Sequence, residues 1–230
     1  YHYDLLRQNG VPEQVLSCGG AFRYGALGGG AVARIADRSD RAAVRVLVAF
    51  SIFSTQAAEL LLAVIEAFSD SSEFQVLLKF HPSLSASRVA AEAGIPLRSL
   101  PAHMRVVDQQ LPQLLQEADV LVYTDTTAAV EALACGVPVA HLLSGQAIDM
   151  DRLGSFDGVR VSAETAEGLR MAVKSAMRVN ATERATRAER WREVVDRLLP
   201  KPDKATVDMF MPGRSNEELT ETGQVTTKVR

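Results

Sequence analysis

Short apolar runs alternate along the chain with longer segments in which apolar residues recur at helical spacing. The runs are rich in Val and Leu, which is typical of buried strands, and lie at 43–51, 74–80, 103–107, 120–123, 137–142 and 159–162. Helical segments are predicted at 56–68, 83–93, 111–117, 128–135, 164–179 and 183–199. A further short strand is predicted at 14–17. Because strands and helices alternate, the pattern predicts an α/β fold with a doubly wound, mostly parallel, Rossmann-like sheet.

The strand predicted at 120–123 leads into a threonine-rich turn and then into an Ala- and Leu-rich helix. Thr124, Thr126 and Thr127 offer hydroxyls where this helix begins, as an N-cap or as ligand contacts. Backbone N–H groups and the helix dipole favour an anion there, and a phosphate is the obvious one. Glu131 follows one turn later, where a carboxylate can accept hydrogen bonds from the vicinal hydroxyls of a sugar. The alternative interpretation is structural, with a capping threonine and a solvated glutamate.

Two earlier loops also carry polar side chains at the carboxyl end of a predicted strand. Ser51 and Thr55 follow the first strand, where capping and ligand contact are equally good interpretations. Lys79 and His81 end the next strand, and residues two apart on a strand point to the same face. A lysine supplies a point charge for phosphate, and a histidine can donate a hydrogen bond or accept a proton.

The loop after the strand at 137–142 adds Gly145 as a further candidate contact. In an open parallel sheet the carboxyl ends of the strands form the edge where ligands bind. We therefore expect these loops to converge on one site for a nucleotide-activated sugar.

Composition limits the possible functions without selecting one. The 230 residues are 47% apolar and 23% charged, with a formal net charge of −3, which is ordinary for a globular domain and does not suggest a nucleic-acid binder. No apolar run approaches the roughly 20 residues that span a bilayer. Cys18 and Cys135 form neither a disulfide framework nor a metal motif. Asp149 and Asp151 form a carboxylate pair without a third ligand, so no metal site is predicted.

Two motifs resemble a known family. Asp119, an apolar strand, the threonine-rich turn and the run from Glu131 to Val139 (Glu-Ala-Leu-Ala-Cys-Gly-Val-Pro-Val) resemble the nucleotide-sugar site in the C-terminal half of GT-B glycosyltransferases. The segment Lys79-Phe80-His81-Pro82 is similar to a turn in glycosyltransferases of capsule and surface-polysaccharide synthesis.

The resemblance assigns roles to these residues. It implies that Glu131 contacts the ribose and that the three threonines of the turn contact phosphate. It also implies transfer of a sugar from a nucleotide-sugar donor to a glycan or lipid-linked acceptor, with no other cofactor. Lys79 and His81 would then be the catalytic groups, because with the helix start they stabilise the charge that grows on the leaving phosphate. The cytoplasm, or the inner face of a membrane, is the expected location.

The resemblance also predicts how the chain is divided. Residues 1–40 would be a lead-in and linker from a missing N-terminal half, and 41–199 the nucleotide-sugar-binding domain. Residues 200–230 are polar and lack periodicity, so a disordered tail is predicted there. Because the family's catalytic base lies in the N-terminal half, this chain is expected to bind nucleotide but to turn over little by itself.

Three alternative functions also fit these residues. A non-hydrolysing UDP-N-acetylglucosamine 2-epimerase shares the fold, the His-Pro turn and a similar Glu-Ala helix. A polyol-phosphate transferase of teichoic-acid synthesis shares the Lys-x-His-Pro pattern, but the run that begins at Glu131 argues against it. The third alternative is a scaffold without catalytic activity that binds a protein partner.

Overall fold

The computed structural model describes residues 6–16, 21, 24, 42–70, 73–145, 151–178, 181–202, 204, 207 and 208. The chain divides into two compact units, one of Leu27–Val195 and one of Tyr1–Ala26 with Asp196–Arg230. Most of the predicted lead-in and linker at 1–40, including Cys18, lies outside the described residues, as do Asp149 and most of the predicted tail. No described helix is both long enough and apolar enough to cross a membrane.

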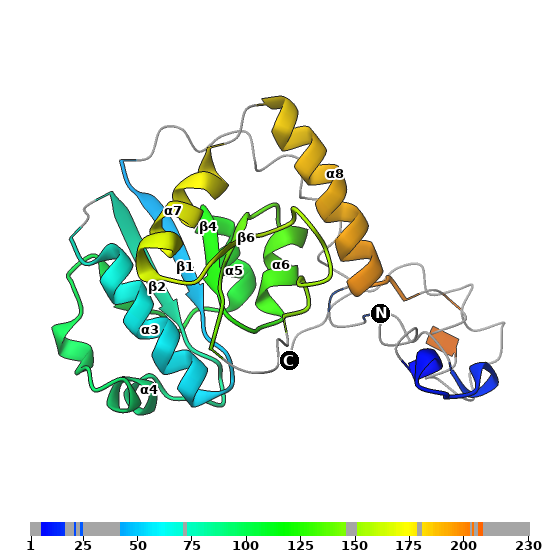
Figure 1. Ribbon diagram of the computed structural model, residues 1–230, viewed down its shortest axis with the longest axis horizontal. Coiled ribbons are helices and arrows are strands. Elements are labelled where there is room, and N and C mark those ends of the chain that lie inside the picture. The colour runs from blue at the N-terminus through cyan, green and yellow to red at the C-terminus, as the bar shows by residue number, and fades with distance from the viewer. Residues whose placement is uncertain are drawn as a thin grey trace, which may run out of the picture. The chain divides into compact units, whose positions relative to one another are not determined.

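The larger unit is built on one parallel sheet, and all six strands of the described residues belong to it. The order across the sheet is β3-β2-β1-β4-β5-β6, which is the order of the Rossmann fold (Figure 1). The strands are β1 Val44–Ala49, β2 Phe74–Lys79, β3 Met104–Val106, β4 Val120–Tyr123, β5 Val139–Leu142 and β6 Val161–Ala163. The predicted fold class is therefore confirmed, and the sheet is parallel throughout these strands.

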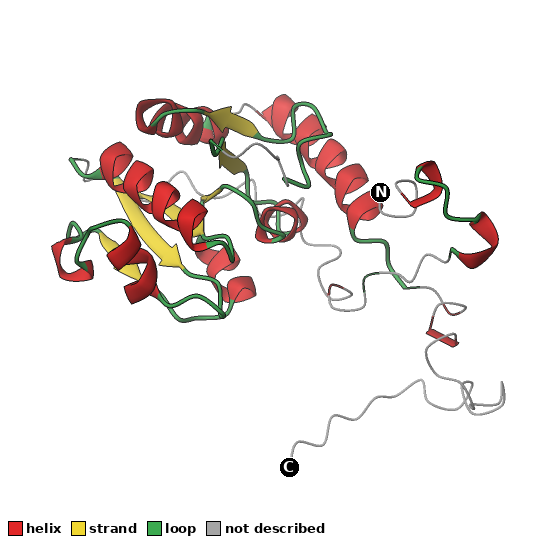
Figure 2. Cartoon of the chain, turned by 60° about the horizontal axis from the view of Figure 1, so that its bottom comes forward, coloured by secondary structure: helices red, strands yellow, loops and turns green. Residues whose placement is uncertain are grey.

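Helices cover both faces of this sheet (Figures 1 and 2). The α-helices that follow the strands are α3 Ser54–Phe68, α4 Ala86–Glu92, α5 Leu111–Glu117, α6 Ala128–Ala134, α7 Ala166–Met177 and α8 Ala181–Leu198. On one face α3 and α7 pack together over a core that includes Val48 of β1 and Val122 of β4. On the other face lie α5 and α6 (Figure 1). Burial on both faces explains why the strands are continuous apolar runs.

Local chemistry sets several of the predicted boundaries. Ser85 caps α4, since its hydroxyl accepts a hydrogen bond from the backbone N–H of Arg88 at 3.3 Å. Pro112 lies in the first turn of α5, where its missing N–H leaves no intrahelical bond unmade. Gly136 has a φ of +70°, a left-handed conformation that ends α6 and turns the chain toward β5.

One predicted strand is wrong. Residues 14–17 were expected to be extended, but a short 3-10 helix (Glu13–Val15) occupies this part of the smaller unit. Two local hydrogen bonds, from the N–H of Val15 to Pro12 and from that of Leu16 to Glu13, satisfy the backbone there. A strand needs a neighbouring strand to pair with, and a short apolar run cannot show whether one is present.

Candidate functional site at the carboxyl edge of the sheet

The direction of winding reverses at β1. From this strand the chain proceeds outward to β2 and β3 on one side, and later to β4, β5 and β6 on the other. In open α/β sheets ligands bind beyond the carboxyl ends of the strands at such a switch point. The register pairs Ala49 of β1 with Lys79 and with Tyr123, so β1, β2 and β4 end at the same level. The loops that follow these three strands therefore open on one edge, as predicted.

The polar side chains after β1 make structural hydrogen bonds. Ser51 is buried, and its hydroxyl accepts a bond of 3.2 Å from the N–H of Phe53, which stabilises the turn into α3. Thr55 donates to Oε1 of Glu92 at 2.9 Å and so joins α3 to α4. Hydrogen bonds from Ser54 and then Thr55 hold the pKa of the Glu92 carboxyl below its ordinary value. The structure thus directs Thr55 toward α4, and its ligand role stays a prediction.

Lys79 and His81 lie where β2 ends, and both have partners nearby. The Lys79 ammonium donates to the carbonyl oxygen of Asp108 at 3.1 Å, which turns it toward the loop after β3 and away from β4. Nδ1 of His81 accepts a hydrogen bond of 3.1 Å from the N–H of Ser83. A neutral His81 in this geometry carries its proton on Nε2 and presents that atom as a donor. Since β1 separates β2 from β4, these groups lie about 10 Å from the β4 exit, or two strand spacings.

The three threonines after β4 differ in their surroundings. Thr124 is only 4% exposed, and its hydroxyl has no hydrogen-bond partner. Thr126 is half-buried and accepts a bond of 3.3 Å from the N–H of Ala128. Thr127 occupies the N-cap position of α6 in a helical conformation, without a side-chain cap bond. The capping threonine is therefore Thr126, one residue before the N-cap position.

Glu131 and Gly145 complete the predicted set. Glu131 lies in the first turn of α6 and is only 5% exposed, because every residue of this helix is buried. The predicted contact with a ribose therefore depends on a carboxylate with little accessible surface, and it stays a prediction. Gly145 is exposed at the end of a described stretch, and a Cβ added there would meet nothing within 4 Å.

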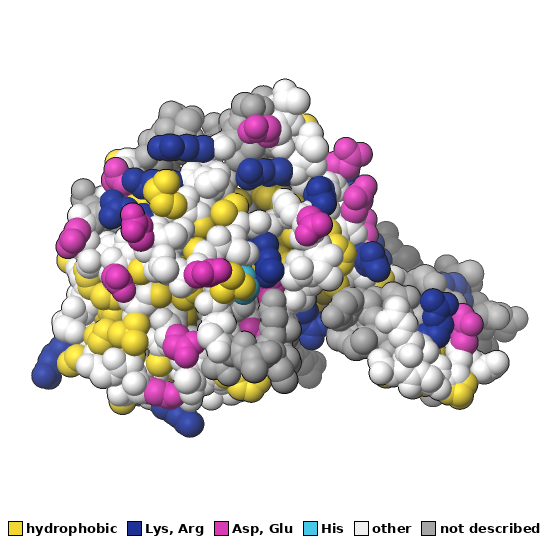
Figure 3. All heavy atoms as spheres, viewed as in Figure 1, with side chains coloured by type: hydrophobic (Ala, Val, Ile, Leu, Met, Phe, Trp, Pro, Cys, Tyr) yellow, Lys and Arg dark blue, Asp and Glu magenta, His cyan; other side chains and the backbone are white. Residues whose placement is uncertain are grey.

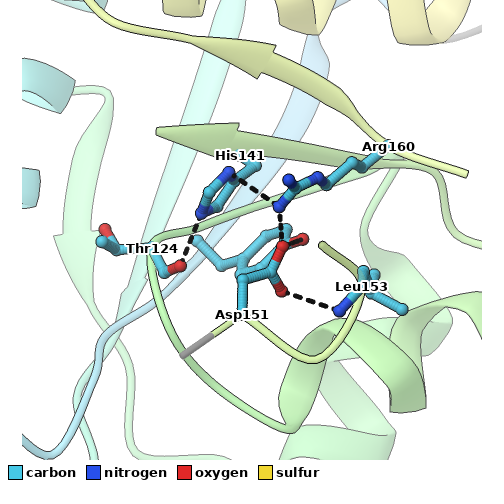
Figure 4. A network of polar contacts seen from close by, with 6 residues as sticks. Thr124, His141, Asp151, Leu153 and Arg160 are labelled. Carbon is cyan, nitrogen blue, oxygen red and sulfur yellow. Dashed lines mark hydrogen bonds and ion pairs between the residues drawn. The ribbon is translucent and has the colours of Figure 1, made fainter. Parts of the chain in front are cut away.

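A buried ion pair lies next to these loops (Figure 4). The Asp151 side chain is 1% exposed and is paired with Arg160, whose side chain is 15% exposed. The same carboxylate accepts hydrogen bonds of 3.1 Å from the hydroxyl of Tyr123 and of 3.1 Å from the N–H of Leu153. Asp151 thus neutralises Arg160 in the interior. Among the described residues, no three His, Cys, Asp or Glu side chains are grouped to hold a metal ion.

His141 extends this network to the loop after β4. Its Nε2 lies 2.7 Å from the carbonyl oxygen of Thr124, and its Nδ1 lies 3.1 Å from a guanidinium nitrogen of Arg160. A carbonyl only accepts and a guanidinium only donates, so the ring is the neutral tautomer with its proton on Nε2. This cluster was not among the predicted site residues. The available signal was a histidine inside the apolar strand Val139–Leu142, although its partners are distant in sequence.

The opposite edge of the sheet has a groove of its own. It is an open groove of about 330 Å³ where β1 and β2 begin and α7 ends, and its lining includes the apolar side chains of Phe74 and Met177. Glu73 on its rim pairs with Lys174 at 2.9 Å. This groove is separate from the carboxyl edge and contains none of the predicted site residues. Over the face seen in Figure 3, acidic and basic side chains are interspersed, in keeping with a net charge of −3.

Comparisons with known proteins find similarity in structure. No protein-family model and no curated protein matches the sequence. The UDP-GlcNAc 2-epimerase of Methanocaldococcus jannaschii, solved with UDP-GlcNAc and UDP, matches with a TM-score of 0.54 and 14% identity, over 85% of this chain and 57% of that one. The calicheamicin glycosyltransferase CalG4 matches with a TM-score of 0.52 and 20% identity, over 82% of this chain and 45% of that one. The spinosyn rhamnosyltransferase SpnG matches with a TM-score of 0.53 and 16% identity, over 80% of this chain and 48% of that one.

These identities establish similarity of fold. The chain spans about half the length of the structures it matches, with 57%, 45% and 48% of them covered. It therefore has the Rossmann-like architecture found in part of two glycosyltransferases and of a nucleotide-sugar epimerase.

Proposed function

We propose that the chain is the donor-binding half of a GT-B-type glycosyltransferase that binds a nucleotide-activated sugar at the carboxyl edge of the sheet. The observation that carries the proposal is the reversal of strand order at β1, with the loops of Ser51, Lys79 and Thr124 opening beside it. Ligands of open α/β sheets bind at this position. The similarity to about half of CalG4 and of SpnG supports the assignment.

The proposed reaction transfers the sugar to a hydroxyl of a surface glycan or of a lipid-linked acceptor. The bond between the sugar's anomeric carbon and the donor phosphate breaks, a bond from that carbon to the acceptor oxygen forms, and a base takes the acceptor's proton. Negative charge grows on the leaving phosphate. In the proposal Lys79 exchanges the carbonyl of Asp108 for this phosphate, His81 donates from Nε2, and the Thr126–Thr127 turn supplies further donors.

The catalytic base is proposed to lie in a second, N-terminal half, so this chain should bind the donor but turn over little by itself. Acting on a lipid-linked acceptor would place the protein in the cytoplasm at the inner face of a membrane. An ordinary rate of sugar transfer by the 230-residue chain alone would contradict the proposal that the catalytic base lies in an N-terminal half.

Calorimetry with UDP, GDP, CDP and CMP tests the proposal and identifies the base. One of the four should bind with a dissociation constant in the micromolar range, which corresponds to about 8 kcal/mol. If none binds, the proposal fails and a scaffold without a nucleotide site becomes the better interpretation.

An epimerase is the second candidate, because the Methanocaldococcus jannaschii enzyme matches over 57% of its chain, more than either glycosyltransferase does. Incubating the chain together with its N-terminal half and UDP-N-acetylglucosamine, without acceptor, separates the two functions. An epimerised nucleotide sugar would favour the epimerase. A requirement for acceptor would favour the transferase.

A further inference from the structure

Two buried polar atoms at the carboxyl edge lack a hydrogen-bond partner. Among the described residues, three buried side-chain atoms are in this position: Oε1 of Gln56, the hydroxyl oxygen of Thr124, and Nε1 of Trp191 on α8. Gln56 is 7% exposed and Thr124 is 4% exposed. The first two follow neighbouring strands, β1 and β4, at the switch point.

Gln56 faces the sheet from the first turn of α3. It lies one helical turn before Leu60, which is fully buried in the core between α3 and the strands. The N-cap residue Phe53 makes no side-chain cap bond, and the first helical hydrogen bond is donated by Ala57 to Phe53. The backbone N–H groups of Ser54 to Gln56 therefore have no acceptor within the helix.

The hydroxyl of Thr124 lies on the same face of the sheet as Gln56. Val120 and Val122 of β4 belong to the core under α3 and α7, and Thr124 continues this alternation past the end of the strand. Figure 4 shows the Thr124 hydroxyl on the far side of the backbone from His141. Gln56 and Thr124 thus lie on the same face of the sheet, next to the ends of the neighbouring strands β1 and β4.

Burying a polar atom without a partner costs free energy, and native proteins retain few such atoms. The chemistry of the two atoms defines the missing group. The amide oxygen of Gln56 only accepts, so its partner must carry a hydrogen, which a deprotonated phosphate oxygen lacks. A hydroxyl meets both needs, because it donates to Gln56 while its oxygen accepts from Thr124 or from a free N–H of α3.

We infer that Gln56 and Thr124 form a subsite for a carbohydrate hydroxyl of the donor's sugar, at the uncapped start of α3. This inference rests on the proposed function. The subsite distinguishes a nucleotide sugar from the free nucleotide, because the free nucleotide lacks the sugar that would satisfy these atoms.

Calorimetry with UDP-N-acetylglucosamine and UDP as probes tests the inference. The unmodified chain should bind the nucleotide sugar about tenfold more tightly than UDP. Gln56→Met and Thr124→Val keep side-chain volume but remove the polar atoms, so each should bring this ratio close to one. The control Gln75→Met, on an exposed position of β2, should keep the ratio of the unmodified chain.

The outcomes separate this inference from the proposed function. Binding of both probes with the same ratio in all variants overturns the subsite and leaves the proposed function standing. A large loss of affinity for UDP itself in Gln56→Met overturns it too, because the amide would then be donating to phosphate. If no nucleotide of the four-member panel binds, both proposals fail.

Thermal unfolding without ligand provides a second test. Removing an orphaned polar atom should raise the melting temperature by about 2–4 °C in Gln56→Met and in Thr124→Val. A fall in both variants would overturn the inference, because it would mean that a buried water or a protein group already satisfies these atoms.

Discussion

His141 donates a hydrogen bond of 2.7 Å from Nε2 to the carbonyl oxygen of Thr124, and so ties the end of β5 to the loop after β4 (Figure 4). On the other side of the ring Nδ1 accepts from Arg160 at 3.1 Å. A guanidinium only donates, so Nδ1 is the acceptor and the ring carries its proton on Nε2. One buried ring thereby fixes the backbone from which the proposed ligand-binding hydroxyl of Thr124 projects.

Replacing His141 with Phe keeps a ring of similar size and removes both hydrogen bonds. Arg160 and the Thr124 carbonyl then lose a buried partner, and the free energy of unfolding should fall by about 2–4 kcal/mol. Urea denaturation measures this change. His103→Phe is the matched control, because His103 makes one hydrogen bond, of 2.8 Å to the carbonyl of Phe68, in a partly buried position. The free energy of unfolding should fall by about 1 kcal/mol in His103→Phe. An equal fall in the two variants would contradict the larger contribution expected of His141.

Replacing Asp151 with Asn leaves the Arg160 charge uncompensated in the interior. Breaking a buried ion pair by removing one partner typically costs about 3–5 kcal/mol, and we expect a loss of this size. Glu117→Gln is the control, since the Arg45–Glu117 pair has side chains that are 34% and 59% exposed. An exposed pair contributes less than about 1 kcal/mol. Urea midpoints of the two variants should differ clearly, and similar midpoints would show that Asp151 is not essential to the network.

Glu92 should make the stability of the chain depend on acid pH. Hydrogen bonds from Ser54 and Thr55 hold its pKa below the ordinary value of 4.5, so the folded state binds a proton less readily than the unfolded state. The resulting stabilisation is present above that value and is lost as the pH falls through the lowered pKa.

Urea midpoints at about pH 6 and about pH 3.5 bracket this window. Thr55→Val removes one of the two hydroxyls and should reduce the loss of stability on acidification, whereas Thr55→Ser keeps the hydroxyl and should behave like the parent chain. Unchanged acid sensitivity in Glu92→Gln would show that the carboxylate has no part in it.

Lys79 should contribute to nucleotide affinity although its ammonium bonds to the carbonyl of Asp108 in this structure. Lys79→Met removes a charge-assisted hydrogen bond to phosphate, and we expect at least a tenfold loss of affinity, about 1.4 kcal/mol. Calorimetry with whichever nucleotide of the panel binds measures it. Lys174→Met is the control, because Lys174 pairs with Glu73 at the opposite edge of the sheet. An equal loss in both variants would indicate a non-specific effect of charge.

Some parts of the fold follow from local sequence. The helix Leu111–Glu117 and the strand Val120–Tyr123 were predicted with their observed bounds, because Pro112 and a short apolar run act within a few residues. Gly136 likewise falls between the helix predicted at 128–135 and the strand predicted at 137–142. Alternation of strands and helices also predicted the fold class and the edge that carries the candidate site.

The surroundings of each candidate residue could not be predicted in this way. Thr55 and Lys79 were expected to be available for ligand, yet their partners, Glu92 and Asp108, lie 37 and 29 residues away. Glu131 looked like a solvated or ligand-binding acid until the packing of α6 buried it. Burial and long-range hydrogen bonds depend on which helices and strands pack against one another. Residues that are adjacent in the sequence do not carry this information.

The amino-acid sequence by itself determined which segments are strands and which are helices, because backbone preference and apolar period act between near neighbours. Only the tertiary structure decided that β1 would lie between β2 and β4, that His141, Asp151 and Arg160 would form one buried cluster, and that Gln56 would face the sheet without a partner. Those outcomes arise from contacts between residues far apart in the chain, where burial removes water and each polar group must find its partner in another element.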